Sequence, residues 1–80
     1  MTFREALLTI LPPKERAKIE AIDGRERRMF WSMGERMCRR RIERKTGRKL
    51  PAKVDWSKWI ELLKEWLPFI LKLLMLFVFI

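Results

Sequence analysis

The chain has 80 residues, a formal net charge of +9, a single cysteine, and neither histidine nor tyrosine. One cysteine excludes an internal disulfide, and a zinc site would need several cysteine or histidine ligands. The sequence also lacks a phosphate-binding loop and a carboxylate pair in a recognisable catalytic setting, so we expect no enzyme, no metal and no cofactor.

The positive charge is concentrated in the middle of the chain. Residues 25–49 carry eleven basic side chains against three carboxylates, a net charge of +8, whereas residues 1–24 are neutral overall. Such a concentration indicates a phosphate-bearing partner, either anionic lipid headgroups or nucleic acid. The first residues do not have the pattern of a secretory signal. We therefore expect the basic part on the cytoplasmic side of a membrane or inside a particle assembled there.

Two short helices are predicted in residues 1–24. Thr2 and Glu5 have the spacing of a capping box, and apolar residues follow at helical spacing. Pro12 and Pro13 end this first helix, and Pro13 begins a second one because proline at the first helical position loses no hydrogen bond. We expect the first helix to pack on the rest of the chain or to dock on a membrane surface. The second is predicted to be a solvated connector.

A longer basic helix is predicted within residues 25–49, with Asp23 as its N-cap and Gly47 beyond its end. Its methionines belong to a narrow apolar seam, which we expect to be buried against a neighbour. Its basic residues are candidates for contacts with lipid phosphates or nucleic acid, unless they serve only solubility or membrane topology. These candidates are Arg28, Arg36, Arg39, Arg40, Arg41, Arg44, Lys45, Arg48 and Lys49.

Cys38 lies beside the methionines of this helix and is surrounded by arginines in the sequence. Neighbouring positive charge favours a reactive thiolate, and a cysteine close to a membrane is a candidate for acylation. A lone cysteine on an apolar side is more often a small buried residue, and we favour that interpretation.

Residues 50–55 are a predicted linker, and Asp55 is the predicted cap of a C-terminal helix over residues 56–80, here called the tail. From Trp59 to Ile80 a helix would be about 33 Å long, enough for a bilayer core of about 30 Å. We therefore predict a membrane anchor, because residues 1–55 offer too little apolar surface to cover the tail. Trp56, Trp59 and Trp66 are predicted at the membrane interface, and Phe69, Ile70, Lys72, Leu73, Leu76, Phe77 and Ile80 are predicted to insert into the membrane or a partner.

Two residues of the tail do not fit a plain membrane span. Pro68 removes one helical hydrogen bond and is predicted to kink the helix. Lys72 places a charge inside the apolar run at a cost of about 3 kcal/mol, so we expect it to contact a partner or a phosphate group.

The predicted fold is all-α, with three short-to-medium helices, a hydrophobic C-terminal helix and little independent core. Its parts are residues 1–24, 25–49, 50–55 and 56–80. We expect a small structural or accessory membrane protein in a larger protein assembly, with the basic head on anionic lipid or nucleic acid. This layout resembles that of small membrane proteins, including viral ones, so a virion component is one form of the prediction. The first alternative is a nucleoprotein or capsid subunit whose tail fills a partner's groove. The second is a membrane-active lysis or pore-forming peptide.

Overall fold

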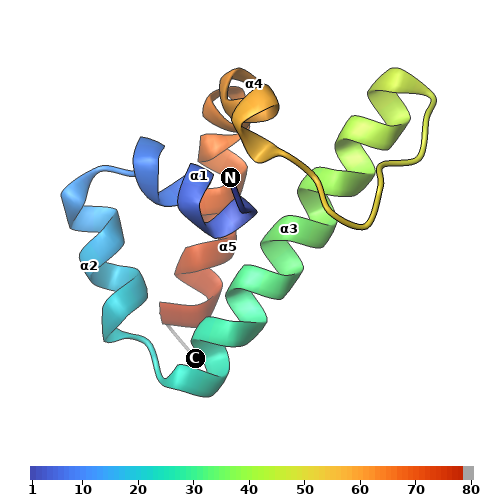
Figure 1. The fold of residues 1–80 in the computed structure, drawn as a ribbon. Helices are drawn as coiled ribbons and strands as arrows, with labels where there is room; N and C mark the ends of the chain where they lie inside the picture. Colours follow the sequence, from blue (N-terminus) through green and yellow to red (C-terminus); the bar gives the residue numbers. More distant parts are fainter. Residues whose placement is uncertain (79–80) are drawn as a thin grey trace.

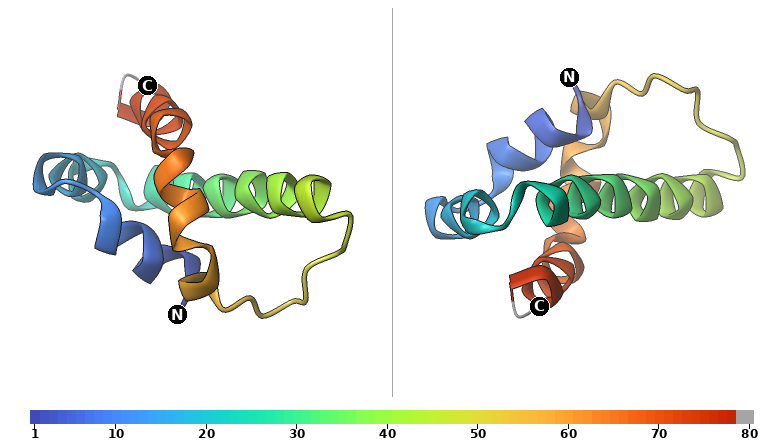
Figure 2. Two further views of the ribbon diagram at one scale, coloured as in Figure 1. Left: turned by 90° about the horizontal axis from the view of Figure 1, so that it is seen from above. Right: turned by 90° about the horizontal axis from the view of Figure 1, so that it is seen from below.

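The computed structural model describes residues 1–78, which form five α-helices and one 3₁₀ turn. α3 runs the length of the molecule, the other helices gather around its N-terminal part, and its C-terminal end extends away from them (Figures 1 and 2). The prediction of an all-α chain is confirmed. The elements are α1 (Phe3–Ile10), α2 (Pro13–Ala21), α3 (Gly24–Thr46), the 3₁₀ turn (Trp56–Trp59), α4 (Ile60–Glu65) and α5 (Leu67–Val78).

Most of the predicted helix ends are confirmed. Thr2 Oγ1 accepts the backbone N–H of Glu5 at 3.1 Å, and the Glu5 carboxylate accepts the N–H of Thr2 at 3.0 Å, which is the predicted capping box. Pro13 is the first residue of α2, and the Asp23 side chain accepts the N–H two residues further on. Gly47 ends α3 at φ 70°, a left-handed conformation that glycine adopts without strain.

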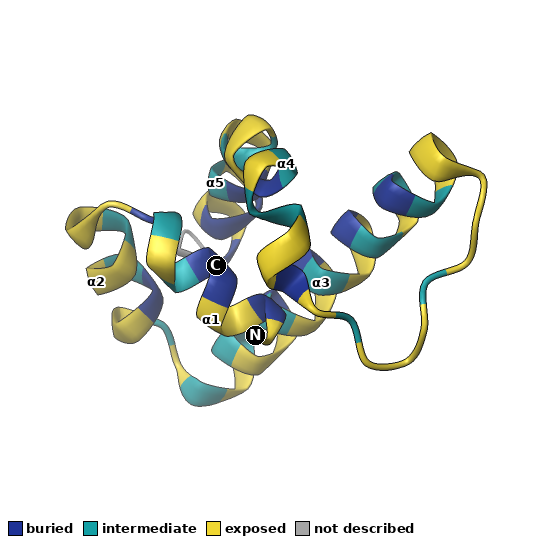
Figure 3. Cartoon of the chain, turned by 45° about the horizontal axis from the view of Figure 1, so that its top comes forward, coloured by how far each residue is buried: buried dark blue, intermediate teal, exposed yellow. Residues whose placement is uncertain are grey.

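The tail folds into the core of its own chain, so the prediction of little independent core is wrong. Residues 1–55 have to cover only one side of α5, and they supply enough apolar surface for that side. Figure 3 shows buried residues where the helices face one another. The core consists of Phe3, Ala6, Leu7, Leu11, Ile19, Phe30, Cys38, Ile42, Trp56, Leu63, Ile70, Leu73, Leu74 and Phe77.

α5 crosses α3 in the opposite direction, and the two helices meet closely at Gly34. A Cβ atom at that position would lie 3.4 Å from the Phe3 ring and 4.0 Å from Leu73, which are van der Waals distances, so α1 and α5 both reach this point of α3. One turn towards the start of α3, the rings of Phe30 and Phe77 meet edge to face with centroids 6.1 Å apart. The buried side of α5 is therefore fixed by contacts at two levels of α3.

The tail is divided at Trp66, close to the predicted kink. Proline has no N–H to donate, so an unbroken helix through Pro68 would leave a carbonyl unpaired in α4. α4 instead ends at Glu65, and Pro68 lies in the first turn of α5, where no donor is needed. α5 has 12 residues, about 18 Å. Among residues 1–78, no helix combines the length and the apolar character that crossing a bilayer requires.

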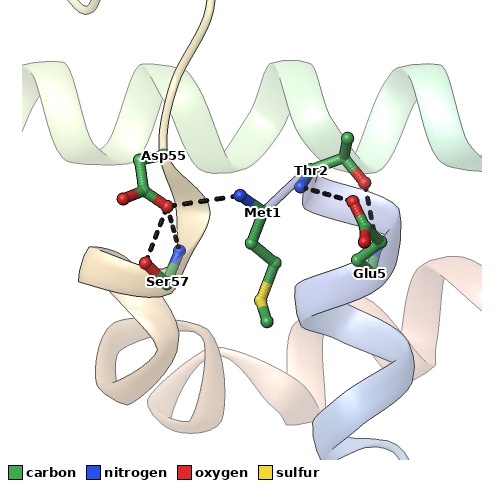
Figure 4. Close-up of polar contacts among 5 residues, drawn as sticks. All are labelled: Met1, Thr2, Glu5, Asp55 and Ser57. Atoms are coloured by element: carbon green, nitrogen blue, oxygen red, sulfur yellow. Dashed lines mark hydrogen bonds and ion pairs between the residues drawn. The ribbon is translucent and has the colours of Figure 1, made fainter.

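The start of the chain is joined to the start of the tail (Figure 4). The amino group of Met1 lies 3.4 Å from Asp55 Oδ1, and the Met1 carbonyl accepts the N–H of Trp56 at 3.0 Å. Asp55 also accepts the hydroxyl and the N–H of Ser57, so it caps the 3₁₀ turn as predicted. Hydrogen bonds from Ser57 lower the pKa of Asp55, and the N–H of Thr2 lowers the pKa of Glu5.

Two neighbouring leucines of α5 test whether the tail is part of the core. Leu74 is 0% exposed and Leu76 is 64% exposed. We expect Leu74→Ala to lower the free energy of unfolding by about 2–5 kcal/mol, because it leaves a cavity. Leu76→Ala should change it by less than about 0.5 kcal/mol. Urea unfolding without lipid or detergent measures both variants. Equal effects of the two substitutions would contradict the packing of α5.

The two capping carboxylates predict a loss of stability in acid. Their ordinary pKa values are 3.8 for Asp55 and 4.5 for Glu5, and both are lowered by folding. In acid the folded chain therefore binds fewer protons than the unfolded chain. The stabilisation by the two carboxylates is complete above their ordinary pKa values, and it is lost as the pH falls through their lowered pKa values in the folded chain. Urea midpoints measured from about pH 6 to about pH 3 should fall less in the Glu5→Gln, Asp55→Asn double variant than in the parent chain. The same fall in both proteins would contradict this account.

Candidate functional site

Basic side chains cover the outer side of α3 and the loop that follows it. Of the nine predicted contact residues, seven are exposed, while Arg39 and Arg41 are half-buried. The exposed basic side chains from the middle of α3 to the start of the following loop are here called the arginine surface. They are Arg36, Arg40, Arg44, Lys45, Arg48 and Lys49.

Within residues 1–78, no carboxylate lies at salt-bridge distance from a side chain of the arginine surface. The nearby Glu43 instead accepts the backbone N–H of Leu50 at 2.8 Å, which fixes the loop after α3. The guanidinium and ammonium groups are therefore available to external anions. Guanidinium groups can bind phosphate oxygens through two parallel hydrogen bonds.

Arg39 and Arg41 have partners inside the fold. Arg39 donates to the carbonyls of Pro51 at 2.8 Å and Ala52 at 3.4 Å, which ties the loop to α3. The Arg41 guanidinium lies 4.5 Å from the centroid of the Phe69 ring and 5.6 Å from that of Trp66, in cation–π contact with α5. Arg41 therefore stands where the basic helix meets the tail.

The methionines of α3 are exposed, so the prediction of a buried methionine seam is wrong. The buried line of α3 consists of Phe30, Gly34, Cys38 and Ile42, spaced four residues apart. Met29, Met33 and Met37 follow the same spacing one position earlier and lie beside the buried line. Both lines have helical spacing in the sequence, and the positions of α1 and α5 decide which one is covered.

The predicted insertion residues of the tail divide between the two sides of α5. Ile70, Leu73 and Phe77 are buried in the core, whereas Phe69, Lys72 and Leu76 are exposed. Ile80 lies outside the described residues.

The tryptophans predicted at a membrane interface also pack inwards. Trp56 is buried in the core, where its ring meets that of Phe3 at 5.0 Å between centroids. Trp59 and Trp66 are half-buried against the core. The Trp66 ring also contacts the basic helix, where it lies beneath the Arg41 guanidinium.

Exposed apolar side chains of α3 and α5 form one patch beside the arginine surface. Met37 and Phe69 line the same small apolar groove between the two helices. Leu76 lies seven residues after Phe69, and Met33 lies four before Met37, so each continues the line of its helix. We call these four residues the apolar patch.

The apolar patch and the arginine surface are continuous. Met33, Met37, Arg40 and Arg44 follow one another at spacings of four, three and four residues, which places them on one side of α3. Lys72 Nζ lies 5.9 Å from the centroid of the Phe69 ring. The combined surface can therefore bind a partner that is both anionic and apolar.

Cys38 is buried, and burial raises the pKa of its thiol to about 12, outweighing the opposite effect of Arg41. The interpretation of Cys38 as a small buried residue is confirmed, and that of a reactive thiolate is wrong. Among the residues that the structure describes, no three acidic or thiol side chains gather in a way that could hold a metal ion.

No protein-family model, curated protein or solved structure matches this chain.

The burial of Cys38 predicts slow reaction with thiol reagents. At about pH 8 we expect alkylation of the native chain to be at least about tenfold slower than in urea, because the thiolate is scarce and covered. A Cys38→Ser, Ser32→Cys double variant is the matched control, since Ser32 is exposed on the same helix. Equal native rates at the two positions, measured by mass spectrometry, would contradict the burial of Cys38.

Proposed function

We propose that this chain is a non-enzymatic binding protein that attaches to phosphate-bearing polyanions through the arginine surface. The observation that carries the proposal is the exposure of the basic side chains of the arginine surface, which have no carboxylate partner within the described residues. A surface of this kind attracts phosphate groups and releases their counterions, so its affinity depends steeply on salt.

Two kinds of partner use this chemistry, and each is favoured by one observation. The apolar patch beside the arginine surface favours an anionic bilayer, where hydrocarbon and phosphate lie close together. The projecting end of α3 favours nucleic acid as the second candidate, because the major groove of a DNA duplex admits an α-helix. In both cases the chain acts as an accessory or structural component that joins an assembly to a charged surface.

The proposed attachment uses the surface of the folded chain instead of a spanning anchor. The side of α5 that a span would turn towards lipid here packs on α3 and α2, and it includes the buried Leu73 and Leu74. A tail seated in a partner's groove and a pore-forming tail both need this same side of α5. These two alternatives stay predictions from the sequence.

Charge reversal on the arginine surface tests the proposal. In about 0.1 M salt, Arg40→Glu with Arg44→Glu should weaken binding to a DNA duplex and to phosphatidylserine vesicles by at least about tenfold. Lys14→Glu with Arg16→Glu changes the net charge equally on the exposed side of α2 and should weaken both much less. Fluorescence anisotropy and vesicle co-sedimentation give the affinities. Equal losses in the two double variants, or no binding by the parent chain, would contradict the proposal.

A further inference from the structure

We infer that the polyanion is the surface of an anionic bilayer, and that the apolar patch inserts into it while the adjacent cations contact lipid phosphates. This inference rests on the proposed function and names its partner. It starts from Phe69 and Leu76, which are 48% and 64% exposed and lie on one line of α5. Met33 and Met37 extend the apolar surface onto α3. Large apolar side chains gathered on one face indicate an interaction site.

The charges around the patch define the chemistry of its occupant. Arg41 and Lys72 approach the same Phe69 ring, at 4.5 Å and 5.9 Å from its centroid, and Arg40 and Arg44 follow Met37 along α3. Any partner that covers the Phe69 ring therefore meets at least two cations at its edge.

The carboxylates of α3 do not balance this rim. Glu43 is bound to the loop through the N–H of Leu50, and one side-chain oxygen of Glu26 is buried inside the fold. Glu35 is half-buried and lines a different depression, together with residues of α1. On the α3 side, the rim of the apolar patch is therefore positive.

A second copy of the chain is a poor occupant of the patch. Two copies facing each other would bring Arg41 and Lys72 of each close to the same groups of the other. Each chain also carries a formal net charge of +9, so the approach would be opposed over a longer distance as well. The occupant must carry negative charge next to apolar material.

A bilayer interface has this combination, because its phosphate groups lie next to its apolar region. The side chains of the patch and its rim can reach both of these layers. Long cationic side chains can hold their charges at the level of the phosphates while their stems and the neighbouring rings enter the apolar region. Arg41 lies over the Phe69 and Trp66 rings in this manner. Methionine side chains adapt to an irregular surface such as lipid. Insertion of this kind is shallow, about 5–10 Å, and leaves the core of the chain intact.

Polar substitution of the patch separates this inference from the proposed function. The test variant is Phe69→Ser with Leu76→Ser, and the control is Met75→Ser, which is also exposed but lies about 100° around α5 from Leu76. Full-length proteins are compared by co-sedimentation with phosphatidylcholine vesicles that contain phosphatidylserine, and by anisotropy with a DNA duplex. Urea midpoints close to that of the parent chain confirm that the variants fold.

We expect the double variant to bind vesicles at least about tenfold more weakly. It loses the favourable free energy of moving the Phe69 and Leu76 side chains from water into the bilayer. Its binding to DNA should stay within about twofold of the parent, since its charges are unchanged. The Met75→Ser control should keep both affinities. A fluorophore on Leu76→Cys, in a Cys38→Ser background, should shift to the blue on vesicles and be quenched by spin-labelled lipid.

Three results would overturn the inference. The first is unchanged vesicle binding by the Phe69→Ser, Leu76→Ser variant, which would leave only surface electrostatics. The second is an unquenched fluorophore at position 76. The third is tight binding of the patch to an acidic polypeptide, such as polyglutamate, without binding to vesicles. Failure of the proposed function has a different signature, because the Arg40→Glu, Arg44→Glu variant would then keep its binding to both vesicles and DNA.

Discussion

The crossing of α5 over α3 is the contact on which the rest of the structure depends. At Gly34 the side chains of Phe3 and Leu73 approach the same point of α3. This joins the first and the last helix through the middle one. The apolar side of the tail is thereby covered by the chain itself, and an 80-residue protein obtains a core with residues from every helix.

The same crossing determines the functional surface. Because α5 is held by Ile70, Leu73 and Phe77 on one side, Phe69 and Leu76 must point outwards beside the methionines of α3. The outer side of the tail then lies next to the arginine helix, with the Arg41 guanidinium over the Phe69 ring. Apolar and cationic groups from distant parts of the sequence form one continuous surface in this way.

Local chemistry made the helix ends predictable from the sequence. The capping box of Thr2 and Glu5, the glycine after α3 and the cap at Asp55 each depend on residues a few positions apart. The break before Pro68 follows from the missing N–H of proline. The basic surface was predictable too, because exposed arginines need no tertiary contact to be exposed.

What covers the tail could not be predicted, since that depends on contacts between residues far apart in the sequence. The run from Trp66 to Ile80, in which Lys72 is the one charged residue, predicts burial, but it does not say whether lipid, a partner or the chain's own helices provide it. The exposure of the methionine line of α3 could not be predicted for the same reason, because Met33 and Phe30 belong to two lines that both have helical spacing. The state of Cys38 depends on burial, which outweighs the arginines near it in the sequence.

Nuclear Overhauser spectroscopy tests the central claim, that the chain covers its own tail, most directly. In dilute aqueous buffer without lipid, we predict contacts between the Phe30 and Phe77 rings and between the α-protons of Gly34 and a methyl group of Leu73. A mixture of labelled and unlabelled chains separates contacts within one chain from contacts between chains. Intramolecular signals are the predicted result. Signals that arise only between chains, or only after lipid is added, would contradict the account.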